Sequence, residues 1–531
     1  MHKYVLIAIF AACAHTALTD RVRADQPGDS AVRDTRLYHE PHRPQFHFSP
    51  PQQWMNDPNG LIFDRGEYHL FYQYHPYSNK WGPMHWGHAV SRDTVHWENL
   101  PIALFPDRNG AIFSGSAILD SANTSGFGSR AKPALVAMFT YHDHLSENLG
   151  STGFEAQGLA YSLDAGRNWI KYPGNPVLTS PAVRDFRDPK VFWFAPTKRW
   201  IVALAMADHI AFYSSRDLKR WTHESDFGRD WGSHAGVWEC PDLFAMPVQG
   251  STKTNYVLLV SVGKGGPNGG TATQYFVGDF DGHGFSLDPT QHEKLRSAAQ
   301  WIDYGTDNYA GSTWSTAKPN NGRPRFIGWM SNWQYATVVP TERWRSAMTL
   351  PRELSLVNTE RGFEVHSLPA PEVQTLRTAQ ANFAAQRIAQ PFELANAANN
   401  KSGLMELNLD LDTRAADTAE LIFSNERGEM TVFRINKKEK RYELDRRSSG
   451  AVNFDPTFSG IQTAPMRDHG DRQILQVFVD QSSIEIFINR GELVLTALVF
   501  PAVPYNSIQL RSESEIGLTA GTVYALKSIW D

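Results

Sequence analysis

Short apolar segments alternate with turn residues along the first two thirds of the chain. From about residue 40 to 350, aromatic and β-branched runs are separated by Gly, Pro, Asn and Asp. Clear examples are 67–74, 134–141, 191–194, 200–205 and 256–262. Such a pattern is typical of many short antiparallel strands, and long amphipathic helical stretches are absent from it. The sequence therefore predicts an all-β fold for this region.

A repeated motif indicates how these strands are grouped. The segments SRDTVHW (91–97), SLDAGRNW (162–169) and SRDLKRW (215–221) each follow one apolar run and precede another. Their intervals are about the size of a four-stranded propeller blade with its loops. We expect the Asp of each copy to bind backbone amides of a turn, and the Trp to pack between blades. Residues 40–350 are thus predicted to form a β-propeller.

The pattern changes after residue 350. Residues 351–390 contain Pro351, Pro369 and Pro371 and run into an Ala-rich stretch, so they are predicted to be a linker. From 391 to 531, apolar and polar residues alternate again, as in LMELNLDL (404–411), which predicts a β-sandwich. This second unit is either a carbohydrate-binding module or a buttress for the propeller. The apolar segment 479–487 favours the buttress, because it has the character of a buried strand.

The N-terminus has the features of an export signal. Residues 1–24 combine Lys3, an apolar run over 4–14 and small residues that permit cleavage. The run is too short to span a bilayer as a helix, so we expect a secreted or periplasmic protein without a membrane span. Cys13 loosely resembles a lipoprotein acceptor, which leaves a lipid anchor as an alternative. If Cys13 is removed, Cys240 is the last cysteine and no intramolecular disulfide forms.

Length, charge and aromatic content limit the number of domains and the classes of binding partner. A chain of 531 residues exceeds what one core usually supports, so two domains are expected. The net charge of −5 provides no field that attracts phosphate backbones, and nucleic acid is excluded as a partner. The 16 Trp residues suit the faces of sugars, although most are expected to pack in the core. The sequence does not specify the oligomeric state.

Three carboxylates stand out because a proline follows each closely. They are Asp57 in NDP, Asp188 in RDP and Glu239 in ECP. Proline cannot continue a central strand, so each acid is predicted to lie at a strand end, where blades converge on a central channel. Glycoside hydrolysis needs two carboxyl groups beside one bond, and a third can stabilise the cationic transition state. The apolar neighbours of Glu239 favour a raised pKa and a role as general acid.

Two other motifs are predicted to have no catalytic role. The segment GKGGPNGG (263–270) lacks the Lys-Ser/Thr ending of a phosphate loop, so a hairpin loop is expected. His142, Asp143 and His144 lack the spacing and the further ligands of a zinc site, and are predicted to be loop residues bordering the pocket. No metal ion and no cofactor are therefore predicted.

The segments around the three acids resemble those of one known family. They are WMNDPNG (54–60), FSGS (113–116), FRDPK (186–190), WECPDLF (238–244), GWMSNWQY (328–335) and SSIEIF (482–487). In this order they are similar to the motifs of glycoside hydrolases of family 32, the fructosidases. The resemblance covers about residues 40–531. It implies a five-bladed β-propeller followed by a C-terminal β-sandwich, and retention of configuration at the anomeric carbon.

The resemblance also implies a role for each site residue. Asp57 would be the nucleophile, Glu239 the acid and base, and Asp188 the stabiliser that holds two fructose hydroxyls. Cys240 would tune the proton affinity of Glu239, and Arg187 would orient the acids. The residues implied to bind substrate are Trp54, Asn56, Gln73, Trp81, Phe113, Ser114, Arg187 and Trp333.

The implied activity is release of terminal fructose from levan, inulin and sucrose through a fructosyl-enzyme. The run 336–354 and Asp242 resemble exo-acting levanases and inulinases. A fructosyltransferase or an endo-acting fructanase of the same family remains an alternative. A sialidase-like propeller is less favoured, because SLDAGRNW fits that group's repeat but no early arginine motif accompanies it. A non-catalytic fructan-binding protein is disfavoured because all three acids are present.

Overall fold

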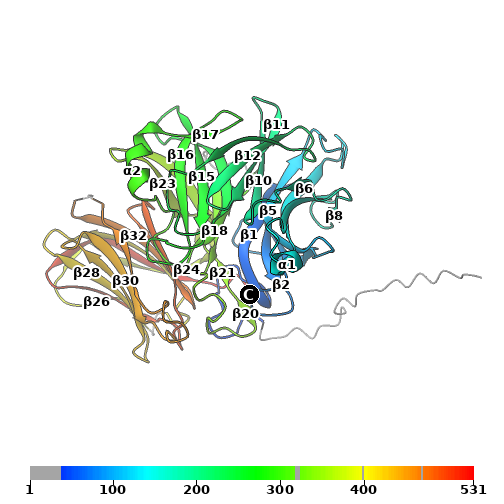
Figure 1. Cartoon of the computed structure of the whole chain (residues 1–531). Helices are drawn as coiled ribbons and strands as arrows, with labels where there is room; N and C mark the ends of the chain where they lie inside the picture. Colours follow the sequence, from blue (N-terminus) through cyan, green and yellow to red (C-terminus); the bar gives the residue numbers. More distant parts are fainter. Residues whose placement is uncertain (1–36, 317–322, 397–399, 468–469, 531) are drawn as a thin grey trace, which may run out of the picture.

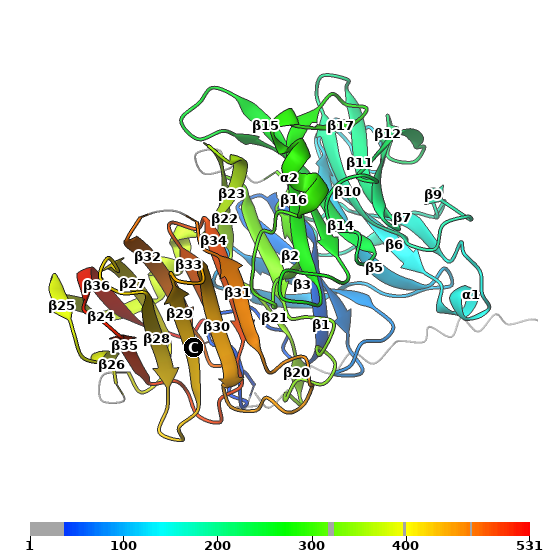
Figure 2. The same cartoon turned by 60° about the vertical axis from the view of Figure 1, so that its left-hand side comes forward.

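A computed structural model describes residues 37–316, 323–396, 400–467 and 470–530. The predicted signal peptide, 1–24, and with it Cys13 lie outside the described residues. Figures 1 and 2 show two bodies side by side, one coloured blue to green and the other yellow to red. Strands dominate both bodies, and the helices are short. The all-β prediction is confirmed.

The first body consists of five sheets, which are the blades of a propeller. Blade 1 contains β1 (Gln53–Asp64), β2 (Glu67–His75), β3 (His85–Ser91), β4 (Glu98–Leu104) and β20 (Trp344–Arg345). Blade 2 contains β5 (Ala111–Asp120), β6 (Ala134–His142), β7 (Glu155–Ser162), β8 (Ile170–Lys171) and β9 (Leu178–Thr179). Blade 3 contains β10 (Phe186–Phe194), β11 (Arg199–Met206), β12 (His209–Ser215) and β13 (Thr222–Phe227).

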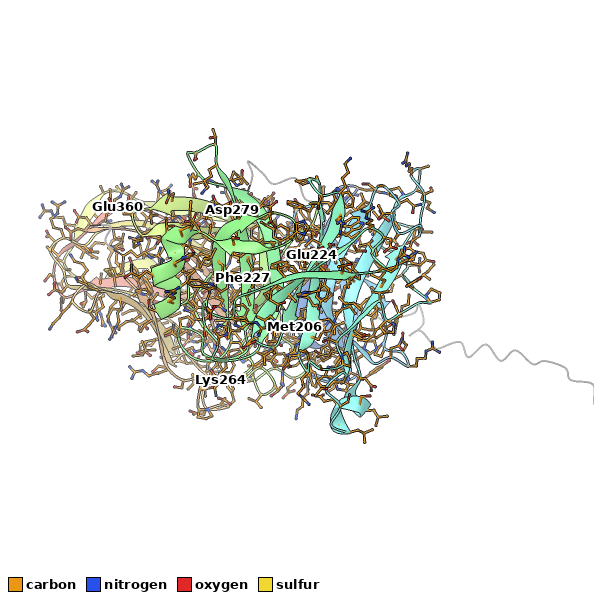
Figure 3. The ribbon with its side chains drawn as sticks, turned by 45° about the horizontal axis from the view of Figure 1, so that its top comes forward. Met206, Glu224, Phe227, Lys264, Asp279 and Glu360 are labelled. Atoms are coloured by element: carbon orange, nitrogen blue, oxygen red, sulfur yellow. The ribbon has the colours of Figure 1, made fainter. Side chains whose placement is uncertain are left out.

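Blade 4 contains β14 (Trp238–Pro247), β15 (Thr254–Val262), β16 (Ala272–Phe280) and β17 (Phe285–Leu287). Blade 5 contains β18 (Tyr309–Thr313), β19 (Arg325–Met330), β21 (Ala347–Met348), β22 (Arg352–Thr359) and β23 (Gly362–Pro369). The ring closes where β20 pairs in parallel with β1, joining the end of the propeller sequence to its beginning. Apolar side chains fill the space between blades. One apolar cluster lies between blades 3 and 4, and it includes Phe227, which is labelled in Figure 3.

The three Ser-Asp-Trp repeats have the structure that their sequence predicts. They connect β3 to β4, β7 to β8 and β12 to β13. In the first copy, Asp93 accepts hydrogen bonds from the amides of Val95 and His96 at 2.9 and 2.8 Å, and Trp97 donates to the carbonyl of Thr94 at 3.1 Å. The other copies repeat the side-chain pattern, with Asp164, Trp169, Asp217 and Trp221 in these roles. The repeats are therefore scaffold at the outer hairpins of three blades.

The predicted linker over 351–390 is wrong. Residues 352–369 form β22 and β23, which complete blade 5, and a 3-10 helix follows over Pro371–Leu376. Residues 377–383 and 386–388 form β24 and β25, which pair with the last strand of the second body. The prolines misled the prediction, because Pro369 ends a strand and Pro371 begins the 3-10 helix.

The second body is a β-sandwich of two antiparallel sheets. One sheet contains β24 (Arg377–Phe383), β25 (Gln386–Ile388), β27 (Met405–Asp412), β32 (Arg472–Val479), β33 (Ser483–Ile488), β34 (Leu493–Leu498) and β36 (Ile516–Leu526). The other contains β26 (Phe392–Ala395), β28 (Thr418–Ser424), β29 (Met430–Asn436), β30 (Arg441–Ser448), β31 (Ile461–Pro465) and β35 (Ser507–Ser512). Alternate residues of β28 and β29 are buried between the sheets, which confirms the predicted alternation.

The strand β33 joins the sandwich to the propeller. Ile484 and Ile486 face the core of the sandwich, whereas Phe487 packs into an apolar cluster shared with residues of the propeller and its N-terminal segment. On that second face, Glu485 accepts a hydrogen bond from Arg352 of blade 5 at 2.5 Å, and both side chains are fully buried. The interface thus combines a buried ion pair with apolar contacts, which supports the buttress interpretation.

Ending the chain after residue 376 is expected to abolish soluble, active protein. The truncation exposes the apolar face of the propeller and removes Glu485 and Arg446, the buried partners of Arg352 and Asp307. Leaving one member of a buried ion pair alone costs about 3–5 kcal/mol. Soluble yield and kcat/KM on sucrose measure the effect. A soluble propeller with full activity would show that the sandwich is dispensable.

Candidate active site

The first strand of every blade bulges where it reaches the centre of the propeller. These strands, β1, β5, β10, β14 and β18, contact one another in a ring. Their pairing registers shift at Met55/Pro58, Ile112/Gly115, Arg187/Lys190, Glu239/Asp242 and Tyr309/Ser312. A bulge bends a strand and redirects its side chains, and bulges are frequent beside active sites. Positive φ angles at Asp188, Cys240 and Ala310 mark three of them.

The three acids lie at these bulges, near the starts of their strands, and the prolines that follow them do not end the strands. Pro58, Pro189 and Pro241 are inside β1, β10 and β14. The predicted strand ends are therefore wrong. The bulge accommodates each proline because the regular ladder, which would need its missing N–H, is interrupted there. The acids nevertheless converge, because each is near the start of an innermost strand.

Asp57 and Asp188 face a single sulfur atom. The Cys240 thiol lies 3.5 Å from Oδ2 of Asp188 and 3.8 Å from Oδ2 of Asp57. The backbone amide of Cys240 also donates to Asp188 at 3.0 Å, and the Ser114 hydroxyl donates to Asp57 at 3.2 Å. Asp188 is buried and Asp57 is partly buried. Two carboxylates from different blades therefore contact the same thiol.

Glu239 is held from both sides. Arg187 donates to its Oε1 through Nε and Nη2, each at 3.1 Å, and the buried Tyr309 hydroxyl donates to its Oε2. Arg187 is fixed in turn by Glu155, at 3.2 Å, and by Asp185, at 2.7 Å. Its orienting role, which the resemblance implied, has a direct geometric basis for Glu239.

One cavity of about 260 Å³ collects these side chains. It is lined by Asn56, Asp57, Gln73, Trp81, Phe113, Ser114, His142, Glu147, Phe154, Glu155, Asp185, Arg187, Asp188, Glu239 and Trp333. The side-chain amide nitrogen of Gln73 is buried without a hydrogen-bond partner among the described residues, so it is a donor available to a ligand. Of the sequence-predicted site residues, all but Trp54 and Cys240 line this cavity.

Trp54 lies behind the cavity and supports it. Its side chain is fully buried, and its Nε1 donates to Oδ1 of Asn56 at 2.7 Å. Its ring stacks on Trp333, with centroids 5.7 Å apart. Trp81 is much more exposed than Trp54, at 41%, and it contacts Phe113 edge to face. Trp54 therefore positions two lining residues, while Trp81 presents its ring to solvent.

Burial and crowding raise the pKa of two of the acids. Burial raises the pKa of Asp57 to about 6, and the neighbouring Glu239 carboxylate adds to the rise, against hydrogen bonds from Asn56 and Ser114. Burial also raises the pKa of Asp188, as do Glu239 and Asp57, although Arg187 opposes them. Burial, followed by the Asp188 charge, raises the pKa of the Cys240 thiol, which stays a neutral donor. Its hydrogen bonds go to Asp188 and Asp57, and the implied role of Cys240 toward Glu239 stays a prediction.

Removing the Ser114 hydroxyl is expected to move the acid limb of the pH profile upward. The hydroxyl donates to Asp57 and favours its ionised form, so Ser114→Ala should raise the pKa of Asp57 further. The acid limb of kcat/KM, which reports groups of the free enzyme, should rise from about pH 6 by roughly half a unit or more. An unchanged limb in the Ser114→Ala profile would show that another group controls it.

Sequence reasoning missed several residues of the site. Glu155 is 1% exposed, accepts the amide of Phe186 at 2.7 Å and binds Arg187, yet no motif marks it. Tyr309 is equally buried and contacts Glu239 from the first strand of blade 5. Thr140 fixes the backbone of Asp188 by accepting its N–H at 3.0 Å. These residues act through other side chains or the backbone, so only their spatial positions reveal them.

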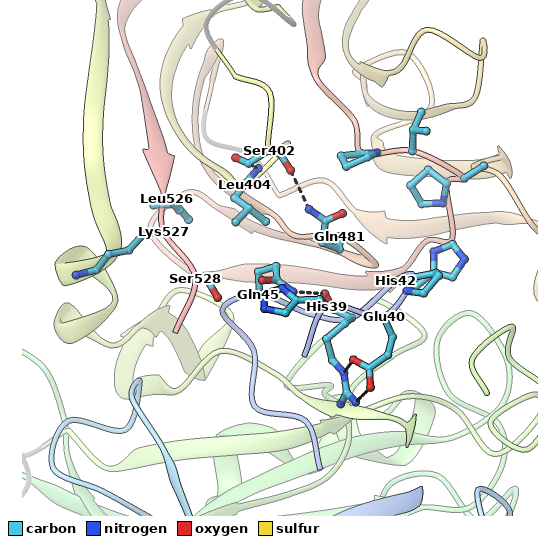
Figure 4. Close-up of a pocket in the computed structure, with 16 residues that line it drawn as sticks. His39, Glu40, His42, Gln45, Ser402, Leu404, Gln481, Leu526, Lys527 and Ser528 are labelled. Atoms are coloured by element: carbon cyan, nitrogen blue, oxygen red, sulfur yellow. Dashed lines mark hydrogen bonds and ion pairs between the residues drawn. The ribbon is translucent and has the colours of Figure 1, made fainter. Parts of the chain in front are cut away.

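A larger cavity lies away from the three acids. It measures about 680 Å³ and lies between the N-terminal segment 39–45 and the sandwich segments 402–404, 501–504 and 526–528 (Figure 4). Its acid Glu40 is paired with Arg43 at 2.8 Å. No pair of carboxyl groups lines it, so it lacks the chemistry of the smaller cavity.

Two family models together match nearly the whole described chain. The model of the glycosyl hydrolases family 32 N-terminal domain matches residues 47–366, and that of the family 32 C-terminal domain matches residues 372–528. The chain belongs to glycosyl hydrolase family 32. Membership confirms the resemblance noted from the motifs, and it replaces the sialidase-like alternative.

Individual family 32 proteins give the same assignment. The chain is 43% identical over 502 residues to a levanase of Bacillus subtilis, covering 94% of this chain and 72% of that protein. It is 37% identical over 523 residues to an extracellular exo-inulinase of Aspergillus niger, covering 93% and 96%.

Among solved family 32 structures, the exo-inulinase of Aspergillus awamori superposes with a TM-score of 0.84 at 34% identity, covering 93% of this chain and all of that one. A β-fructofuranosidase of Schwanniomyces occidentalis complexed with fructosyl-erythritol gives a TM-score of 0.81 at 28% identity, covering 93% and 99%. The five-bladed propeller with a C-terminal sandwich is thereby confirmed, and the chain is a glycosidase of the levanase and exo-inulinase type.

Proposed function

We propose that the chain releases terminal β-D-fructose from levan, inulin and sucrose by a retaining double displacement. Asp57 and Glu239 act on the glycosidic bond, and Asp188 binds the fructose ring. The observation that carries this proposal is the gathering of three carboxylates from three blades, with Arg187, around one cavity of about 260 Å³. Nucleophilic catalysis and proton transfer need just such a pair of acids at one bond.

In the first step, a carboxylate oxygen of Asp57 attacks the anomeric carbon of the terminal fructose. The bond from that carbon to the leaving oxygen breaks, and Glu239 gives its proton to the departing oxygen. The transition state carries positive charge on the ring. Asp188, which accepts the Cys240 amide at 3.0 Å, is fixed where its negative charge stabilises that ring and its free oxygen accepts sugar hydroxyls.

In the second step, Glu239 is ionised and takes a proton from water. The water oxygen attacks the anomeric carbon, the ester to Asp57 breaks, and fructose leaves with its original configuration. Arg187 and Tyr309 both donate to Glu239 and hold its carboxyl group in place for the two proton transfers.

An exo mode of attack fits the size of the cavity. A volume of about 260 Å³ is below the range of sites for drug-sized ligands, and it suits one terminal sugar better than the interior of a chain. The name of the exo-inulinases to which this chain is similar supports the same mode. Sucrose ends in the same fructosyl unit, so it should also be cleaved.

Product analysis on levan, inulin and sucrose tests this function. Fructose as the single early product from both fructans is expected. Fructo-oligosaccharides from the fructans would instead indicate endo attack. Longer fructosylated sugars formed from concentrated sucrose would indicate a fructosyltransferase, because that activity differs only in what accepts the fructosyl group. Binding of levan without any released fructose would indicate a non-catalytic protein.

Export from the cell accords with this function. Fructans are polymers, and the exo-inulinases to which the chain is similar are named extracellular. Within the described residues, none of the helices has the length and apolar character needed to span a membrane. We therefore place the enzyme outside the cytoplasm, delivered by the signal that residues 1–24 predict.

A further inference from the structure

Three metal-ligating side chains meet at the rim of the substrate cavity. His142 ends β6, and His144 and Glu147 belong to the short helix α1 (His144–Asn148). One ligand atom from each lies within 4.8 Å of the others. The imidazole centroids are 4.4 Å apart, and Nε2 of His142 is 3.0 Å from Oε2 of Glu147. The further ligand that the sequence seemed to lack is Glu147, which folding brings to the two histidines.

The backbone around this cluster is firmly held. Asp143 caps α1 by accepting the amides of Leu145 and Ser146 at 3.0 and 3.2 Å, and its own amide donates to the carbonyl of Phe154 at 2.9 Å. His144 and Glu147 are three residues apart in α1, a spacing that places side chains on one side of a helix. The predicted loop is therefore a capped turn that presents both residues toward His142.

A buried carboxylate orients the central histidine. Nδ1 of His142 is 3.0 Å from Oε1 of Glu155, which is 1% exposed. Such a carboxylate–histidine contact fixes the ring and directs its other nitrogen to a metal ion in many sites. Here the other nitrogen points at Glu147, so two carboxylates flank one imidazole. A cation bound between His142 and Glu147 would replace the contact that their side chains make at 3.0 Å.

The surrounding charge also favours a cation. Glu147, Glu155, Asp185 and the three acids of the site contribute negative charge to one cavity. Arg187 is committed to Glu239, Glu155 and Asp185. Arg184 contacts Glu147 at 3.1 Å, but its side chain is half exposed, so a cation can displace it from the carboxylate.

We infer that His142, His144 and Glu147 form an inhibitory binding site for a divalent transition-metal ion such as Zn²⁺. Two imidazole nitrogens and one carboxylate oxygen form a donor set that Zn²⁺ accepts with a fourth position left for water. Such a set disfavours Mg²⁺ and Ca²⁺, which take oxygen ligands. The side chains need to close further on the ion, and the partly exposed positions of His144 and Glu147 permit this.

Occupation of this site would obstruct fructose binding. His142 and Glu147 line the substrate cavity, and the His142 ring stacks on Phe113 with centroids 4.2 Å apart. The rings of His144 and Trp81 pack edge to face, with centroids 5.7 Å apart. A bound ion with its water would hold these aromatic rings in place and occupy the cavity rim. The inhibition should therefore raise KM for sucrose with little change in kcat, a consequence that rests on the proposed function.

Direct binding is tested without substrate. Calorimetric titration of EDTA-treated full-length protein with Zn²⁺ should show one site per chain, and Co²⁺ should give the visible absorption of a tetrahedral complex. His144→Phe keeps an aromatic ring beside Trp81 but removes the ligand nitrogen, so it should weaken Zn²⁺ binding by about tenfold or more. His283→Phe is the matched control, since His283 also pairs with a glutamate, Glu224 at 2.7 Å, but lies outside the cavity.

The inhibition assay separates this site from the proposed function. Zn²⁺ should raise KM for sucrose in the unmodified enzyme and in His283→Phe, EDTA should reverse the effect, and His144→Phe should resist it. Glu147→Gln serves as a second ligand variant if His144→Phe does not fold. Equal Zn²⁺ affinity in all variants, or equal inhibition of His144→Phe, would overturn the inference. Zn²⁺ binding by a protein that cleaves no fructan would contradict the proposed function alone.

Discussion

Asp57→Ala is expected to lower kcat on sucrose and levan by about four orders of magnitude or more while the protein remains folded. The substitution removes the nucleophile and leaves the other residues that line the cavity unchanged. The pKa of Asp57 in the folded protein is raised to about 6, above its ordinary value of 3.8, so its ionised form costs folding free energy. That cost develops as pH rises from about 4 to 6 and persists above it. Asp57→Ala should thus unfold at pH 7 no earlier than the unmodified protein.

Asp64→Asn provides the control for this variant. Asp64 ends the same strand, β1, and its carboxylate pairs only loosely with Arg65, at 3.5 Å. It lies outside the lining of the cavity, so kcat should stay close to that of the unmodified enzyme. Initial rates and thermal unfolding of both variants measure the difference. An active Asp57→Ala enzyme with a normal KM would refute the nucleophile assignment.

Glu239→Gln is expected to show a loss that depends on the leaving group. On sucrose and levan, whose leaving oxygens need a proton, kcat/KM should fall by about 10²–10⁴. On an aryl β-D-fructofuranoside with an acidic phenol as leaving group, bond cleavage needs no proton and kcat/KM should fall far less. The amide retains the size of the carboxylate and its contact with Tyr309, so folding should be preserved.

The ratio of the two losses identifies the general acid. Comparable losses on sucrose and on the aryl fructoside would mean that Glu239 serves the reaction in another way, for instance by holding Arg187. Asp185→Asn is the matched control, because Asp185 also binds Arg187, at 2.7 Å, without contacting the reacting atoms in the proposed mechanism. In Asp185→Asn, kcat/KM should fall by the same factor on sucrose and on the aryl fructoside.

Much of the fold is encoded in local patterns. The Ser-Asp-Trp repeats predicted the turn hydrogen bonds of Asp93 and the grouping of strands into blades. Both could be predicted because each repeat closes one hairpin with contacts between its own residues. The alternation in β28 predicted the sandwich for a similar reason, since one face of the strand is buried. Patterns that depend on neighbours in sequence can be interpreted without a structure.

Features that depend on distant contacts were missed or misjudged. Proline after each acid was taken to end a strand, yet β1, β10 and β14 continue through Pro58, Pro189 and Pro241 at bulges whose shape depends on the adjoining strand. Proline likewise suggested a linker where β22 and β23 complete blade 5. Neither error affected the prediction that the three acids lie close together, because the bulges also direct them into one cavity.

Local motifs revealed some residues of the site, whereas others are recognised only from contacts between distant parts of the chain. The acids and the residues beside them in the chain were identified, since they belong to motifs of consecutive residues. Glu155 and Tyr309 were not, because their importance arises from contacts with Arg187 and Glu239, which are far away in sequence. Glu147 completes the group of metal ligands in the same way, through the fold of α1 against β6.

Mass spectrometry of the trapped intermediate tests whether Asp57 is the residue that becomes fructosylated. In Glu239→Gln the base for the second step is missing, so an aryl β-D-fructofuranoside should load the enzyme faster than water releases it. After rapid acid quenching and digestion, we expect one added fructosyl group on the peptide that contains Asp57. A label on the peptide of Asp188, or an unlabelled enzyme that releases fructose of inverted configuration, would contradict it.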